Sequence, residues 1–210
     1  MRKRLMIIGA SGHGKVVADI ARKTENYCEI AFLDDDLSRS VPGYELLGRV
    51  GDYEKWREDW EFIIAIGNCG IRAKIQEKID TMTSIATLIH PHAVIGEQVT
   101  LGKGTVVMAN AVINSGAILG KGVIVNTGST IDHDCRIGDY VHVAPGSHIS
   151  GTVFVGGGAW IGVGSSIINN VKICENCIIG AGTTVIQDIN ESGTYVGVPA
   201  KRVSHEGKGK

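Results

Sequence analysis

The chain has 210 residues and a formal net charge of −1, which leaves room for one or two domains and excludes a globally basic surface for nucleic acid. The apolar run behind the basic N-terminal residues is too short for a signal peptide, and no segment approaches the roughly 18 apolar residues of a membrane span. The chain has 5 cysteines, and this odd number does not suggest a framework of paired disulfides, which agrees with a reducing compartment. We therefore expect a soluble, cytoplasmic protein without nucleic-acid or membrane partners.

The first part of the chain, residues 1–82, alternates between short apolar runs and segments of helical pattern. Strands are predicted at 5–9, 29–33 and 62–66, and helices at 15–23 and 71–79. This alternation predicts a small parallel sheet with Rossmann-like connections.

Polar residues follow each predicted strand of this part. Ser11, Gly12 and His13 follow the first strand, Asp34-Asp35 the second and Gly67-Asn68 the third. Ligands of parallel sheets bind at the carboxyl ends of the strands, and a glycine turn that opens a helix presents N–H groups to a phosphate. A nucleotide or nucleotide-linked ligand is therefore predicted, with Asp34 about 20 residues beyond the turn, where an acid can accept from a ribose or base.

The spacing of Gly9, Gly12 and Gly14 does not match the dinucleotide fingerprint G-x-G-x-x-G. A tight strand–helix turn that binds nothing is therefore the alternative interpretation of these glycines.

From Ile89 to Asn190 the sequence repeats every six residues. Each repeat begins with Ile, Leu or Val, and its fifth residue is almost always small or β-branched. Such hexads predict a parallel β-helix over residues 83–192, with a C-terminal extension over 193–210. With three hexads in each coil, residues 18 apart stack along the axis at about one strand spacing of 4.8 Å. The first and fifth residues of each hexad then point inward.

This register places His133 on the surface, between Asp132 and Asp134. A neighbouring carboxylate can orient the imidazole and stabilise its protonated form, as a general base requires. Gly151 stacks on His133 and leaves backbone groups open beside the ring, where an acyl carbonyl can be held. A polar turn without catalytic use is the alternative. His142 falls on another face, with Ile124 and Trp160 as its axial neighbours.

Cys174 and Cys177 have the spacing of a C-x-x-C pair, but the period turns Cys177 into the core. No second Cys or His pair follows them. We therefore predict no metal site.

Several stretches match one family: Ile8–Lys15, Phe32–Asp35, Ala65–Asn68, Asn126-Thr127 with Ile131–Cys135, and Val196–Lys201. On these stretches the chain resembles the bacterial sugar acetyltransferases of the NeuD/PglD type, and the resemblance covers nearly its whole length. It implies an α/β Rossmann-like domain that binds a nucleotide sugar, joined to a left-handed parallel β-helix. It also implies a homotrimer that uses acetyl-CoA as co-substrate.

The resemblance also implies roles for individual residues. His133 is expected as the general base and Asp134, where a member of the group has Glu, as the acid that raises its basicity. His142 is expected to contact the acetyl thioester. The glycine above the base corresponds to Gly151, and the CoA chain is expected to pass Val163 and Ala181. The residues that contact the nucleotide sugar in the family correspond to Ser11, Gly12, His13, Asp34, Asp35 and Gly67.

The expected reaction is acetyl transfer to the amino group of a nucleotide-linked amino-deoxysugar, similar to UDP-4-amino-4,6-dideoxy-N-acetylglucosamine, for glycan biosynthesis. Acetylation of a hydroxyl of sialic acid or another sugar is the first alternative. A γ-type carbonic anhydrase is a second, but it needs two His five residues apart, whereas His142 and His148 are six apart. A non-catalytic scaffold, which would not bind CoA, is the third.

Overall fold

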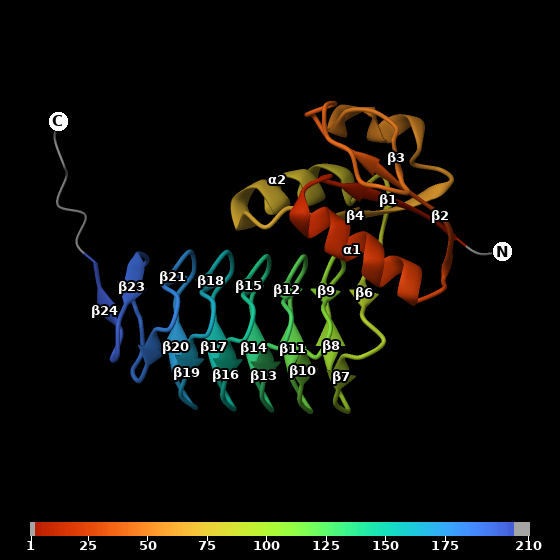
Figure 1. The fold of residues 1–210 in the computed structure, drawn as a ribbon. Helices are drawn as coiled ribbons and strands as arrows, with labels where there is room; N and C mark the ends of the chain where they lie inside the picture. Colours follow the sequence, from red (N-terminus) through yellow and green to blue (C-terminus); the bar gives the residue numbers. More distant parts are fainter. Residues whose placement is uncertain (1–2, 204–210) are drawn as a thin grey trace, which may run out of the picture.

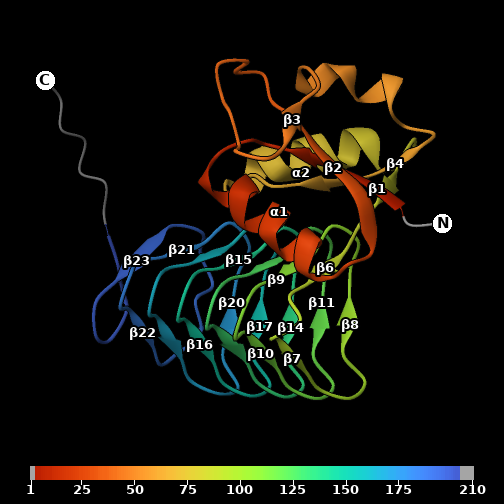
Figure 2. The same ribbon diagram turned by 45° about the vertical axis from the view of Figure 1, so that its right-hand side comes forward.

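The computed structural model describes residues 3–203, which form an α/β domain and a three-sided coil of short strands (Figure 1). The α/β domain lies along one side of the coil in both views (Figures 1 and 2). Residues 204–210 of the expected C-terminal extension lie outside the described residues. No helix in the described part of the chain is long and apolar enough to cross a membrane.

The α/β domain is built on a five-stranded parallel sheet in the order β3-β2-β1-β4-β5. Its elements are β1 (Lys3–Ile8), α1 (Gly12–Lys23), β2 (Tyr27–Leu33), β3 (Glu45–Leu46), the 3₁₀ helix η1 (Val50–Lys55), β4 (Trp60–Ile64), α2 (Cys69–Ile79) and β5 (Ser84–Ile85). Successive side chains of β1 point to opposite faces of the sheet, and those from Leu5 to Ile8 are all buried, which explains the layers. Leu5 and Ile7 pack with α1 on one face, and Met6 and Ile8 pack with η1 and α2 on the other. The predicted Rossmann-like sheet is confirmed.

The sheet continues past residue 82, because β5 pairs with β4 as its edge strand. From β1 the chain passes to β2 on one side, and β4 lies on the other. The strand order therefore reverses at β1. In open α/β sheets a ligand crevice forms outside the carboxyl ends of the strands at such a point.

The coil is made of three sheets, here called sheets I, II and III, whose strands are parallel except for the last strand of sheet I. Sheet I contains β6 (Leu88–Ile89), β9 (Val106–Val107), β12 (Ile124–Val125), β15 (His142–Val143), β18 (Trp160–Ile161) and β21 (Ile178–Ile179), extended by β23 (Thr194–Val196) and β24 (Lys201–Arg202). Sheet II contains β7 (Val94–Ile95), β10 (Val112–Ile113), β13 (Thr130–Ile131), β16 (His148–Ile149), β19 (Ser166–Ile167) and β22 (Thr184–Val185). Sheet III contains β8 (Thr100–Leu101), β11 (Ile118–Leu119), β14 (Arg136–Ile137), β17 (Phe154–Val155) and β20 (Lys172–Ile173).

The register of the coil is the predicted one. Ile124 pairs with His142, and His142 pairs with Trp160, so residues 18 apart stack. The hexads thus form the parallel β-helix expected from their period. β23 pairs in parallel with β21, so the chain beyond residue 192 adds to sheet I.

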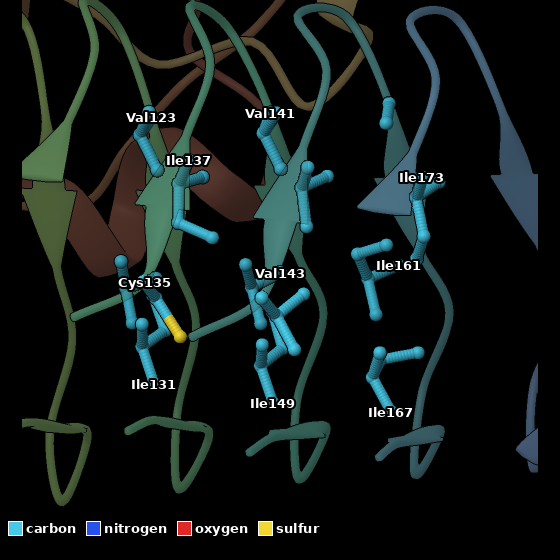
Figure 3. Close-up of a cluster of buried hydrophobic side chains, with 14 of the residues drawn as sticks. Val123, Ile131, Cys135, Ile137, Val141, Val143, Ile149, Ile161, Ile167 and Ile173 are labelled. Atoms are coloured by element: carbon cyan, nitrogen blue, oxygen red, sulfur yellow. The ribbon is translucent and has the colours of Figure 1, made fainter. Parts of the chain in front are cut away.

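The core of the coil consists of the first and fifth residues of the hexads (Figure 3). Ile131, Cys135 and Ile137 are fully or almost fully buried there. Cys177 is also buried in this core, as predicted. Ile89, which leads the first hexad, is 36% exposed, because the first coil has no coil stacked on its outer side.

Candidate active site

The Gly-rich turn joins β1 to the N-terminus of α1. Gly9 has φ +108°, and a Cβ on Gly14 would lie 2.0 Å from the Gly9 carbonyl oxygen, so the turn can close only on glycine. Ser11 stands at the N-cap without a side-chain capping bond, and Gly12 faces open space. The N–H groups of the first turn of α1 are therefore available to an anion.

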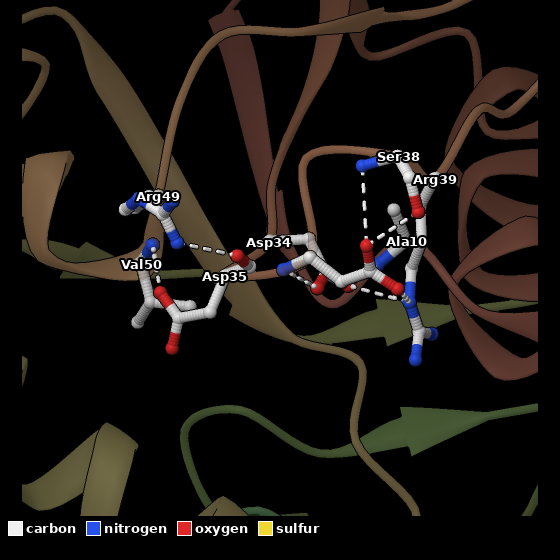
Figure 4. Close-up of polar contacts among 8 residues, drawn as sticks. Ala10, Asp34, Asp35, Ser38, Arg39, Arg49 and Val50 are labelled. Carbon is white, nitrogen blue, oxygen red and sulfur yellow. Dashed lines mark hydrogen bonds and ion pairs between the residues drawn. The ribbon is translucent and has the colours of Figure 1, made fainter.

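Asp34 and Asp35 lie at the end of β2 beside this turn (Figure 4). Asp34 accepts hydrogen bonds from the Ala10 N–H (2.7 Å) and the Asp36 N–H (2.9 Å), so its carboxylate ties the Gly-rich turn to the loop after β2. Asp35 accepts from the Val50 N–H through Oδ1 (3.0 Å), which leaves Oδ2 for other partners. The structure thus brings Ser11, Gly12 and both acids to one edge of the sheet.

Gly67 lies at the end of β4, between the α/β domain and sheet I. Its carbonyl accepts from Nη1 of Arg72 (2.8 Å) and faces Nδ1 of His142 at 3.4 Å. Asn68 next to it caps α2 by accepting from the Ile71 N–H (2.9 Å). The loop after β4 is therefore held directly above the β-helix.

His142 lies on sheet I beneath this loop and is only 6% exposed. Its ring centroid is 4.2 Å from that of Trp160 and 6.4 Å from that of His13. Burial, followed by the positive charge of Arg72, lowers the pKa of His142 to about 4, and the same two causes lower the pKa of His13 to about 4. Both imidazoles are therefore neutral near pH 7.

The neighbours of His142 decide its tautomer. Asn126 accepts from the Thr127 N–H through Oδ1 (2.8 Å), so its Nδ2 is the group that faces His142 Nε2 at 3.1 Å. An amide nitrogen only donates, so Nε2 is the acceptor and the ring proton sits on Nδ1. That proton points toward the carbonyl of Gly67.

His133 and Asp134 lie on the corner between sheets II and III. Asp134 has φ +57°, and its Oδ2 is 2.8 Å from His133 Nδ1. Asp132 accepts from the His133 N–H and from Asn114 Nδ2, both at 2.8 Å, which fixes the start of the corner. The hydrogen bond to Asp134, with the charges of Asp132 and Asp134, raises the pKa of His133. Since Nδ1 faces the carboxylate, Nε2 is the atom that can take a proton.

Gly151 lies in the next coil, directly against this imidazole. A Cβ at Gly151 would be 2.5 Å from His133 Nε2, so the absence of a side chain makes room for the ring. The Gly151 N–H has no acceptor among residues 3–203. A donor next to the proton-accepting atom is the arrangement that an oxyanion at an acyl carbon requires.

Val163 and Ala181 lie on the corner between sheets I and II. The Val163 carbonyl accepts from the Gly182 N–H (2.8 Å), so the two residues stack in successive coils, as their spacing predicts. Val163 is 54% exposed, and Ala181 is exposed as well. An apolar strip therefore runs along this corner.

A single chain does not bring all the predicted site residues together. Ser11, Gly12, His13, Asp34, Asp35 and Gly67 follow the carboxyl ends of β1, β2 and β4, and of these His13 and Gly67 lie next to His142 of sheet I. His133 and Asp134 lie on the corner opposite that sheet.

Arg72, which is fully buried at the junction of the two parts, was not predicted as a functional residue. Its guanidinium donates to the carbonyls of Ile66 and Gly67 in one part and of Gly122 and Tyr140 in the other. An arginine on an amphipathic helix is usually exposed, so no pattern marks it. Asn126 stands within a family motif, but only the structure reveals its contact with His142.

The three histidines that a γ-type carbonic anhydrase would need lie apart, with His142 on sheet I, His148 on sheet II and His133 on a corner. Within residues 3–203 no three His, Cys, Asp or Glu side chains are grouped so that they could hold a metal ion.

Comparisons with known proteins cover both parts of the chain. Residues 4–79 match the PglD N-terminal domain, and residues 116–151 and 152–187 match the bacterial transferase hexapeptide repeats. The acetyltransferase domain of PglB from Neisseria gonorrhoeae is 39% identical, with a TM-score of 0.93 over 96% of this chain and 100% of that one. The chain belongs to the PglD-type hexapeptide acetyltransferases.

Two further relatives extend this likeness. PerB from Caulobacter crescentus, solved with CoA and GDP-perosamine, is 37% identical, with a TM-score of 0.92 over 97% of this chain and 99% of that one. The UDP-N-acetylbacillosamine N-acetyltransferase of Bacillus subtilis is 36% identical over 111 residues, which are 50% of this chain and 51% of that protein. The match therefore spans about half the length of this curated relative.

Proposed function

We propose that this protein transfers the acetyl group of acetyl-CoA to the amino group of a nucleotide-linked amino-deoxysugar. The observation that carries the proposal is the pair formed by His133 and Asp134, in which Nδ1 faces the carboxylate and Nε2 faces Gly151. Membership in the acetyltransferase family supports the reaction class. The GDP-perosamine and CoA bound to PerB support the classes of acceptor and donor.

In the proposed reaction the amine nitrogen attacks the carbonyl carbon of the thioester while His133 Nε2 accepts a proton from that nitrogen. The tetrahedral oxyanion accepts a hydrogen bond from the Gly151 N–H. When the C–S bond breaks, the imidazolium returns its proton to the leaving thiolate, so the products are an amide and the free thiol of CoA. His133 ends the cycle neutral.

The acceptor is proposed to lie at the carboxyl ends of β1, β2 and β4. Its phosphates would meet the N–H groups at Ser11 and Gly12, and its nucleoside would lie near Asp34 and Asp35. The sugar would extend past His13 and Gly67. Residues 1–82 act in this proposal as the acceptor domain, 83–192 as the transferase domain and 193–210 as the extension.

The donor is proposed to run along Val163 and Ala181, with its thioester near His142. Because the acceptor residues and His133 occupy opposite sides of one chain, the complete site needs a second subunit, and a homotrimer with one site at each interface meets this need. The proposal places the protein in the cytoplasm, where acetyl-CoA is available.

The test is an assay of CoA release by the purified full chain with acetyl-CoA and a panel of acceptors. UDP- and GDP-linked 4-amino sugars should react, and the acetylated product should carry an amide by mass spectrometry. Turnover of free or nucleotide-linked sialic acid, with no turnover of any amino sugar, would replace the proposal by O-acetylation. No CoA release with any acceptor would contradict it.

A further inference from the structure

The carboxylate of Asp134 lies against the backbone of the preceding coil. A Cβ on Gly116 would be 2.7 Å from Asp134 Oδ1, well inside van der Waals contact. The other oxygen, Oδ2, is the one that faces His133 Nδ1 at 2.8 Å. One carboxylate thus rests on Gly116 through one oxygen and holds the imidazole through the other.

The imidazole rests on a second glycine, one coil further along the axis. His133 is packed against Gly151, where a Cβ would be 2.5 Å from Nε2. The pair is therefore enclosed between two residues that have no side chain: Gly116 on the carboxylate side and Gly151 on the imidazole side. The two neighbouring coils thus leave the space that the imidazole and the carboxylate occupy.

Backbone conformation does not explain the glycine at 116. Its φ is +75°, but the equivalent positions one coil before Gly116 and in the next two coils after it carry other residues at similar angles. Gln98 has φ +59°, Thr152 has φ +61°, and Asp134 itself has φ +57°. Since side chains occupy this left-handed position elsewhere in the same stack, the requirement at 116 is for space.

We propose that Gly116 is a positioning residue for the reaction, because its missing side chain leaves the room in which the Asp134 carboxylate reaches His133. This rests on the proposed function of the pair. A Cβ at 116 would clash only with the carboxylate end of Asp134, since the Asp134 backbone nitrogen, at 3.8 Å, is at ordinary contact distance. The fold therefore adapts by moving the carboxylate, and the contact with His133 Nδ1 is lost.

The test compares Gly116→Ala with Gly128→Ala. Gly128 has φ +65° and nothing within 4 Å of its Cβ position, so this control carries the same backbone strain without the contact. Because Asn tolerates a positive φ, Gly116→Asn and Gly128→Asn form a second pair if the alanine variants fold poorly. Asp134→Asn provides the reference for loss of the carboxylate.

The first readout is the pKa of His133, followed by NMR of histidines labelled in the ring, with His133→Ala used for assignment. The charged groups that act on His133 are Asp132 and Asp134. Gly116→Ala should lower its pKa in the same direction as Asp134→Asn, and Gly128→Ala should leave it at the wild-type value. The second readout is kcat for acetyl transfer, which should fall about tenfold in Gly116→Ala with little change in KM for acetyl-CoA.

An unchanged His133 pKa in both Gly116 variants would overturn the proposal, as would an equal shift in the Gly128 controls. An unchanged pKa in Asp134→Asn would also overturn it, since there would be no contact to protect. Because the titration needs no substrate, a wild-type protein that acetylates nothing would contradict the proposed function while the role of Gly116 remains measurable.

Discussion

Nη2 of Arg72 in α2 donates to the carbonyl of Tyr140 in the β-helix over 2.6 Å, with both groups buried at the junction of the two parts. The same guanidinium donates from Nε to the Gly122 carbonyl (2.7 Å) and from Nη1 to the Gly67 carbonyl (2.8 Å). A guanidinium carries five N–H donors in one plane, so these carbonyls can satisfy the buried Arg72 without a carboxylate partner. Arg72 therefore fixes the loop that carries Gly67 above His142.

Replacing Arg72 by Met gives an apolar side chain of similar size and leaves the buried carbonyls of Gly122 and Tyr140 without a donor. We expect Arg72→Met to lower the free energy of unfolding by at least about 3 kcal/mol, because hydrogen bonds to charged groups contribute about 1.5–3 kcal/mol each. Urea unfolding at fixed protein concentration measures it, with exposed Arg22→Met as the control. A change within about 0.5 kcal/mol of wild type would show that the junction does not depend on Arg72.

Replacing the proposed base tests the chemistry separately from binding. His133→Ala should lower kcat by about 10²–10⁴-fold, the usual contribution of a general base. The dissociation constant for acetyl-CoA, measured by calorimetry, should stay near that of wild type, since the proposed donor strip lies on another corner. A variant that keeps wild-type kcat would remove His133 from the mechanism.

The hexad period predicted the stacking partners of His133 and His142. Because inward-facing aliphatic residues recur every six positions, the place of a residue in its hexad determines its place in the coil. Gly151 lies against His133, and Ile124 and Trp160 flank His142, as the register requires. Cys177 lies in the core for the same reason.

The period could not predict contacts between the two parts of the chain. Arg72 finds its acceptors among main-chain carbonyls, which every residue carries, so nothing in the sequence marks them. The burial of His142 depends on the loop at Gly67, which comes from the non-repeating part. The fit of Asp134 on Gly116 depends on a side-chain torsion, which a six-residue repeat does not encode.

Two histidines with strongly lowered pKa values, the half-buried His13 and the buried His142, predict how stability depends on pH. His13 and His142 have pKa values of about 4 in the folded protein, below the ordinary value of 6.5. Between these values the unfolded chain binds more protons, so stability falls as the pH decreases from about 6.5 to about 4. The slope should reach up to about 1.4 kcal/mol per pH unit for each histidine.

Urea unfolding at several pH values in this window measures the slope. His142→Gln should flatten the curve, whereas His148→Gln, at an exposed position on sheet II, should leave it unchanged. An equal slope in wild type and His142→Gln would mean that the imidazole is not held neutral by burial.

The proposed sharing of the site between subunits predicts complementation between two inactive variants. His133→Ala lacks the base but keeps the acceptor domain. Gly12→Asp keeps the base, and its added carboxylate should repel the phosphates at the N-terminus of α1, where nothing lies within 4 Å of the Cβ position. Each variant alone should therefore show little activity.

When the two variants are unfolded together in equal amounts and refolded, trimers of mixed composition should form. If each site takes its base from one subunit and its acceptor domain from the next, about one site in four receives both intact parts. CoA release should then recover to about a quarter of the wild-type rate, whereas the two variants refolded separately and then mixed should stay inactive. Jointly refolded protein that stays inactive, although mass spectrometry detects mixed trimers, would mean that each chain carries its own complete site.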